Sequence, residues 1–178
     1  MDYKILYYTI GLCHFLGISA IATYGTLFRK GKYDLYVLLS IFAIIILWTV
    51  HNGECFITQY VKQFTYETPN VVSTGILQYT QEPEPDMLFI FNGNRDSLCI
   101  FSTLIIIMYL VSIWQLLLRN NYSIYSCLGL SIVYIAYLTA YKLRKSGTSK
   151  HSFDIINKIT GMTYLTFGLY VFYRLWML

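Results

Sequence analysis

Five long apolar runs constrain this chain more than any other feature of its sequence. They cover residues 5–27, 35–57, 98–118, 124–141 and 155–178. An α-helix rises about 1.5 Å per residue and the hydrocarbon core of a bilayer is about 30 Å thick, so a run of about twenty apolar residues can cross it. We therefore predict an all-α fold, an integral membrane helical bundle with about five transmembrane helices in a single domain.

The composition argues against a soluble globular protein. Hydrophobic residues make up 56% of the 178 residues and charged residues only 12%, whereas a soluble domain has about 25% charged residues. A soluble chain of this length buries only about two-thirds of its surface on folding, which would leave too much apolar surface in water. We therefore expect the lipid bilayer to surround most of the chain and to be its main partner.

Basic residues gather in the links between the apolar runs. Arg29, Lys30 and Lys32 follow the first run, and a second basic link covers residues 142–150. Charge placed in this way bears on membrane orientation, so the net charge of +4 gives no reason to expect nucleic-acid binding. The first link favours an external N-terminus, which is the orientation that we prefer, whereas the basic residues summed over all links favour the opposite one.

The one sizeable polar segment, residues 64–97, carries five acidic residues against the single basic residue Arg95. The Glu-Pro-Glu-Pro run at 82–85 disfavours helix, and Asn92-Gly93-Asn94 predicts a turn. We expect an acidic extramembrane loop that packs on the membrane surface. Loops of this length are usually functional or disordered, so this loop is also where we expect a protein partner to bind.

The stretch that ends the second apolar run holds the densest group of reactive side chains. His51, Glu54 and Cys55 lie at positions i, i+3 and i+4, so on a continuous helix they share one face. Counted from the basic link, His14 on the first run lies within about 5 Å of the same depth. The sequence therefore predicts a polar pocket of His14, His51, Glu54 and Cys55 between the first two helices.

Several chemistries suit this pocket. Imidazole, carboxylate and thiol groups are ligand types for zinc, copper or iron, and two histidines can also ligate haem. None of the spacings matches a known ligand pattern, so we predict no metal and no cofactor. A structural hydrogen-bond cluster at the helix end and a pocket that handles protons or a polar substrate both stay open.

The cysteines at positions 13, 55, 99 and 127 form no CxxC pair, which argues against a redox motif or a zinc knuckle. In the predicted topology Cys55 and Cys99 lie at the same membrane face. They can therefore be bridged if that face is oxidising, and a free thiol at each position is the alternative.

Two further patterns bear on helix packing. Tyr134, Tyr137 and Tyr141 recur at helical spacing, and we expect their rings to pack within the bundle. Gly161 and Gly168 lie seven residues apart on one helical face, so they allow another helix to approach closely.

The run Asn52-Gly-Glu-Cys-Phe-Ile-Thr58, followed by Lys62 and by Thr-Pro-Asn at 68–70, resembles a pattern in small multi-span membrane proteins of nucleocytoplasmic large DNA (giant) viruses. In those proteins an Asn-Glu-Cys-type sequence ends a span and runs into a Lys-bearing segment and a Pro-Asn turn. The Tyr- and Ile-rich composition also resembles that of AT-rich viral genomes. The resemblance implies a viral or intracellular membrane location, and it implies no activity and no site residue.

Together these patterns predict a multi-pass membrane protein that serves as a structural or assembly component of a viral or intracellular membrane. The alternative is a small membrane enzyme or redox protein that uses His14, His51, Glu54 and Cys55. A channel or carrier is less favoured, because the runs carry few charges and show no inverted repeat of broken helices.

Overall fold

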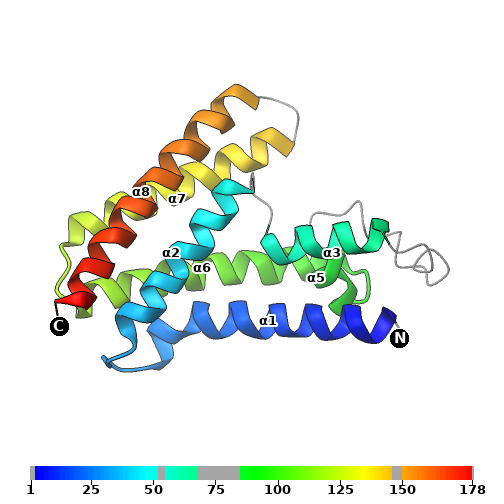
Figure 1. Cartoon of the computed structure of the whole chain (residues 1–178), viewed down its shortest axis with the longest axis horizontal. Helices are drawn as coiled ribbons and strands as arrows, with labels where there is room; N and C mark the ends of the chain where they lie inside the picture. The colour runs from blue at the N-terminus through cyan, green and yellow to red at the C-terminus, as the bar shows by residue number, and fades with distance from the viewer. Residues whose placement is uncertain (1–2, 52–54, 68–84, 146–149, 178) are drawn as a thin grey trace. The chain divides into compact units, whose positions relative to one another are not determined.

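The computed structural model describes residues 3–51, 55–67, 85–145 and 150–177, and all regular structure in these ranges is helical (Figure 1). The helices are α1 (Tyr3–Leu27), α2 (Asp34–Val50), α3 (Phe56–Glu67), α5 (Pro85–Ile90), α6 (Arg95–Arg119), α7 (Ile124–Lys145) and α8 (Lys150–Trp176). The predicted all-α class is therefore confirmed.

Three of these helices are long and apolar enough to cross a membrane. The qualifying segments are Tyr8–Leu27 in α1, Arg95–Arg119 in α6 and Ile124–Arg144 in α7. They coincide with three of the five predicted spans, which supports a membrane location for the chain. α2 is apolar but has only 17 residues, and α8 has 27 residues but is less apolar.

The second predicted helix ends earlier than residue 57. α2 stops at Val50, and His51 is its C-cap residue, with its N–H bonded to the Leu47 carbonyl at 3.0 Å. A new helix, α3, then begins at Phe56. The prediction of one continuous helix here is wrong, and the sequence gives the reason, since Asn52 and Gly53 are residues that commonly follow a helix end.

Contacts along the chain form two compact units. Unit 1 consists of Met1–Ala22 and Glu54–Met108, and unit 2 consists of Thr23–Gly53 and Tyr109–Leu178. The long helices α1 and α6 each contribute their N-terminal part to unit 1 and their C-terminal part to unit 2.

Aromatic rings join α1 to α6 in unit 1. The ring of Phe15 stacks on Phe101 with 4.6 Å between centroids, and Phe91 lies against both rings. α3 packs on the short helix α5 and buries Val61. Some apolar side chains of α1 therefore contact other parts of the protein instead of facing the bilayer.

The turn predicted at Asn92-Gly93-Asn94 is confirmed. Asn92 and Gly93 both have positive φ angles, of 51° and 78°, which asparagine and glycine tolerate better than other residues. Asn94 then caps α6, because its side-chain oxygen accepts a hydrogen bond from the Ser97 N–H at 3.0 Å. This short sequence therefore ends α5 and starts the longest apolar span.

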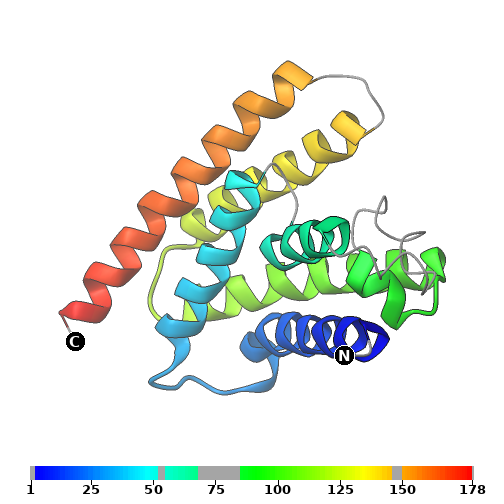
Figure 2. The ribbon, with the colours of Figure 1, turned by 45° about the vertical axis from the view of Figure 1, so that its right-hand side comes forward.

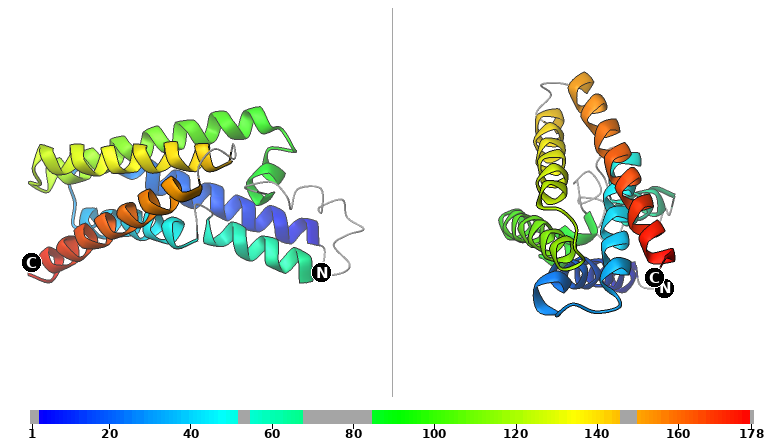
Figure 3. Two further views of the ribbon diagram at one scale, coloured as in Figure 1. Left: turned by 90° about the horizontal axis from the view of Figure 1, so that it is seen from above. Right: turned by 90° about the vertical axis from the view of Figure 1, so that its left-hand side faces the viewer.

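α8 packs on both α2 and α7 in unit 2, and it runs antiparallel to them (Figures 1, 2 and 3). The buried rings of Tyr134 and Tyr137 on α7 stack with 6.5 Å between centroids. The hydroxyl of Tyr164 on α8 donates a hydrogen bond to the Leu130 carbonyl at 2.9 Å. The expectation that the α7 tyrosines pack within the bundle is confirmed for these two residues.

The two glycines on α8 face α2, as their spacing predicts. A Cβ at Gly161 would lie 2.7 Å from the Thr49 hydroxyl, and one at Gly168 would lie 3.9 Å from Phe42. Next to this contact, Asn157 donates a hydrogen bond to the Thr49 carbonyl at 2.7 Å. Close approach of α8 thus gives the last turn of α2 a buried polar partner.

Candidate functional site

Two of the four predicted pocket residues meet in unit 1. The Sγ atom of Cys55 lies 3.3 Å from Nε2 of His14, although 41 positions separate them along the chain. His14 is buried on α1, and Cys55 is half-buried just before α3. A thiol and an imidazole at this distance can share one proton, which is the arrangement that activates cysteine nucleophiles. We refer to it as the Cys55–His14 pair.

Cys55 also occupies the N-cap position of α3. Its carbonyl accepts the first helical hydrogen bond, from the Gln59 N–H at 3.0 Å. Its sulfur accepts hydrogen bonds from the backbone N–H groups of Ile57 and Thr58. A helix N-terminus carries partial positive charge, so this position stabilises the thiolate form of Cys55.

The pKa of the Cys55 thiol reflects these opposing effects. Burial by itself raises that pKa, but the hydrogen bond and charge interaction with His14 and the two backbone N–H groups outweigh burial. The pKa of the thiol is therefore below its ordinary value, and a larger fraction of Cys55 is thiolate at neutral pH than for a typical cysteine.

The other two predicted pocket residues, His51 and Glu54, are described separately from the Cys55–His14 pair. His51 belongs to unit 2, where it is half-buried at the end of α2. Glu54 lies outside the described residues. The prediction that His51 and Cys55 share a helical face is wrong, because α2 ends at Val50 and Cys55 precedes α3.

Cys55 and Cys99 are both free thiols in the structure, and so are Cys13 and Cys127. Among the residues that the structure describes, no group of three or more His, Cys, Asp or Glu side chains is placed to hold a metal ion.

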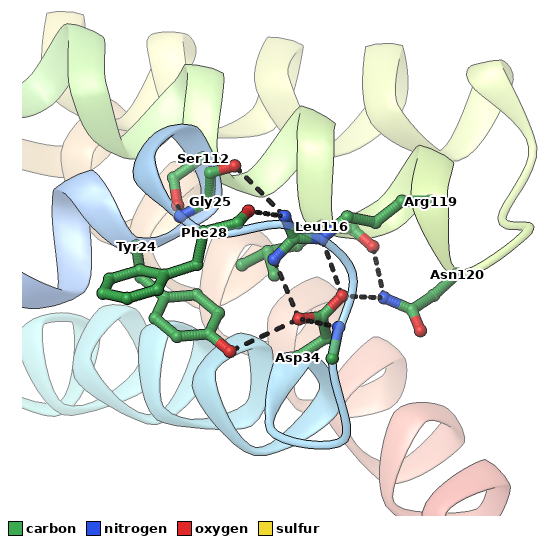
Figure 4. A network of polar contacts seen from close by, with 9 residues as sticks. Tyr24, Gly25, Phe28, Asp34, Ser112, Leu116, Arg119 and Asn120 are labelled. Atoms are coloured by element: carbon green, nitrogen blue, oxygen red, sulfur yellow. Dashed lines mark hydrogen bonds and ion pairs between the residues drawn. The ribbon is translucent and has the colours of Figure 1, made fainter.

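A second polar site, which the sequence analysis missed, lies in unit 2 around Asp34 (Figure 4). Nε of Arg119 lies 2.6 Å from Oδ2 of Asp34, and Nη2 lies 2.8 Å from Oδ1. Asn120 donates to Oδ2 at 3.2 Å, and the Gly31 N–H and the Tyr24 hydroxyl donate to Oδ1. The carboxylate, which is fully buried, thus receives donors from three parts of the chain. We call this set the Asp34–Arg119 network.

Helix ends explain why these charges gather. Asp34 is in the first turn of α2 and Arg119 is in the last turn of α6, which are the positions where helix dipoles favour an acid and a base. Arg119 also donates to the carbonyls of Gly25 and Phe28 at the end of α1. One guanidinium therefore satisfies carbonyl groups that have no partner inside their own helix.

Alternation of the spans is the signal that could have revealed this network. The links after the first and third predicted spans lie on the same side of the membrane whenever consecutive spans alternate in direction. Asp34 belongs to the first of these links and Arg119 to the second. Opposite charges that sit beside helix ends at one membrane face are candidates for pairing, even when 85 positions separate them.

Comparison with known protein families, curated proteins and solved structures finds no match to this chain. The resemblance of the stretch around Cys55 to giant-virus membrane proteins therefore remains a hypothesis. The two polar sites and the apolar helices are the features of the chain that bear on its function.

Proposed function

We propose that the chain is a multi-pass membrane protein that acts through the thiol of Cys55, with His14 as the group that takes its proton. The 3.3 Å separation of Sγ and Nε2 is the observation that supports this most directly. An imidazole buried on an apolar helix is costly unless it is paired, so its position next to the one thiol at a helix N-terminus favours a chemical role.

The proposed reaction class is nucleophilic attack by the Cys55 thiolate. His14 accepts the thiol proton, and the resulting imidazolium together with the α3 N-terminus stabilises the sulfur anion. A thiolate of this kind can attack a thioester, so that the acyl group moves to Sγ and the other thiol leaves with the proton from His14, or a disulfide, so that a mixed disulfide forms and one thiol is released in the same way. The protein would then be a small membrane enzyme or redox protein. Glu54, which lies outside the described residues, stays a candidate for a further member of the site.

Alkylation kinetics test the proposal. In the full-length protein in detergent, we expect Cys55 to react with iodoacetamide faster at pH 7 than the exposed thiols Cys13 and Cys99. Because the pKa of Cys55 is lowered, its alkylation rate should increase over a lower pH range than that of an ordinary cysteine, whose pKa is about 8.5. Mass spectrometry of digested protein gives the rate at each cysteine.

Replacement of His14 by glutamine removes the proton acceptor and keeps a polar side chain. We expect the alkylation rate of Cys55 at pH 7 to fall, and the pH range over which this rate increases to move upward, because His14 provides the largest interactions that lower the pKa of the thiol. His151→Gln, at an exposed imidazole on α8, is the matched control and should leave the rate unchanged. Equal rates in the His14 variant and the control would exclude His14 as the activating group.

A structural or assembly role in a viral or intracellular membrane is the second candidate. It is favoured by the Asp34–Arg119 network, because its carboxylate and guanidinium groups bind each other and hold helix ends together rather than face a substrate. In this case the acidic segment 64–97 would bind the partner. Half of this segment, residues 68–84, lies outside the described residues, and much of the rest is helical rather than a loop, because it belongs to α3, α5 and α6. Cys55→Ser separates the two candidates, because it abolishes thiol chemistry and leaves assembly intact.

We also propose that α2 and α8 cross the bilayer, which gives five spans. The side of α8 that faces away from the protein carries large apolar residues, where a helix exposed to water would carry polar ones. These exposed residues are Ile155, Ile159, Met162, Leu165 and Leu169. The 17 residues of α2 reach about 25 Å, which is the lower limit for a transmembrane helix.

A further inference from the structure

A cavity of about 270 Å³ lies between α7 and α8 in unit 2, near the basic link that joins the two helices. Small side chains on α7, Ala136 and Ala140, leave the space open, and Phe153 and Ile156 on α8 form the opposite wall. Apart from two hydroxyl residues, Thr139 and Ser152, the lining is apolar.

The depth of the cavity follows from its position on α7. The apolar segment of α7 ends at Arg144, which places this residue at the membrane surface. Ala136 lies eight residues earlier, about 12 Å deeper along the helix axis. The cavity therefore extends from the headgroup region into the hydrocarbon layer, and its apolar walls suit an acyl chain rather than water.

Positive charge lies at the shallow end of the cavity. The guanidinium of Arg144 lies over the ring of Phe153, 4.6 Å from its centroid, and Phe153 is itself part of the cavity wall. Exposed Lys142 is on the same turn of α7, and exposed His151 is the second residue of α8. Half-buried Asp154 is the one acidic residue in the sequence from 142 to 154, against four lysines and arginines.

An apolar cavity with cations at the headgroup level matches both parts of an anionic lipid. We propose that the space between α7 and α8 binds one anionic phospholipid of the surrounding bilayer, with an acyl chain against Ala136 and Ala140 and the phosphate beside Arg144. Basic pockets between transmembrane helices on the cytoplasmic or matrix side bind anionic lipid headgroups in this way. The link between α7 and α8 would therefore lie on that side, in the orientation favoured by the basic residues summed over all links. A zwitterionic lipid would fill the cavity equally well but would gain less from the positive charge.

Lipid titration of the delipidated full-length protein in detergent tests this proposal. We expect phosphatidylglycerol to raise the melting temperature and to stay bound in native mass spectrometry, and phosphatidylcholine with the same acyl chains to do so more weakly. Sodium phosphate at the same concentration should have no effect. Equal effects of the two lipids, or stabilisation by phosphate alone, would overturn the proposal.

Two variants locate the lipid. Arg144→Gln should weaken phosphatidylglycerol binding about fivefold, as expected for loss of one cation near the surface, and should weaken phosphatidylcholine binding less. Ala136→Leu should fill the cavity and weaken binding of both lipids. Ala136 is exposed on α7, so this change does not disturb the protein core.

Gly129→Leu is the matched control for added bulk, because Gly129 is also exposed on α7 and a Cβ there meets nothing within 4 Å. It should bind both lipids like the wild-type protein. Circular dichroism confirms that each variant keeps its helices. Wild-type binding by Arg144→Gln and Ala136→Leu in folded protein would exclude this cavity as the lipid site.

Discussion

Arg119→Ala should be the most destabilising single truncation of a polar side chain in unit 2. Removal of one partner from a buried ion pair typically costs about 3–5 kcal/mol, because it leaves an uncompensated charge. Here the remaining Asp34 carboxylate is 0% exposed, and the carbonyls of Gly25 and Phe28 lose their donor at the same time. Thermal unfolding of the detergent-solubilised protein, followed by circular dichroism, measures the loss.

Arg29→Ala provides the control for this prediction. Arg29 lies in the link between α1 and α2 but is exposed, so its removal should change stability by about 0.5 kcal/mol or less. Asp34→Ala should be nearly as harmful as Arg119→Ala, since it leaves the guanidinium without its main partner. The double variant should cost clearly less than the sum of the two single ones. If Arg119→Ala melts like Arg29→Ala, the network does not hold the helix ends together.

The helical class of the fold could be predicted because it depends on a property of whole segments. A run of about twenty apolar residues has few stable conformations other than a membrane helix, since a bilayer offers no partner for open backbone groups. The ends of α1, α6 and α7 therefore agree closely with the predicted runs. α2 was predicted too long because the predicted span was continued across the polar residues 51–54 to Phe56 and Ile57, whereas α2 ends at Val50.

In the candidate site, one feature could be predicted from the sequence and two others could not. The pairing of His14 with Cys55 could be anticipated, because both can be placed at one depth by counting from a shared link. The N-cap role of Cys55 could not be, since it requires that a new helix begin at Phe56. The Asp34–Arg119 network was missed because charged residues in links are usually solvated. The burial of Asp34 depends on donors from segments that are distant in the sequence, such as Tyr24 and Arg119.

Gly25→Ala tests that packing directly. Gly25 on α1 faces Ser112 on α6, and its N–H donates to the Ser112 hydroxyl at 2.8 Å. A Cβ at position 25 would lie 2.6 Å from the Ser112 carbonyl oxygen, 2.7 Å from its Cα and closer still to its Oγ. Two of these atoms belong to the backbone, so a change of rotamer cannot relieve the clash. We expect a loss of about 1–3 kcal/mol, as for other overpacked sites, measured by thermal unfolding.

Gly17→Ala is the matched control on the same helix, because a Cβ at Gly17 meets nothing within 4 Å. Alanine favours helix over glycine by up to about 1 kcal/mol, so this variant should be as stable as the wild-type protein or slightly more stable. The same substitution should thus have opposite signs two turns apart. Ser112→Gly should rescue Gly25→Ala only in part, since it removes the Oγ contact and leaves both backbone contacts. Equal stability of the two glycine variants would mean that α1 and α6 do not approach each other closely at Gly25. The guanidinium of Arg119 would then be unable to donate to the carbonyls at the end of α1.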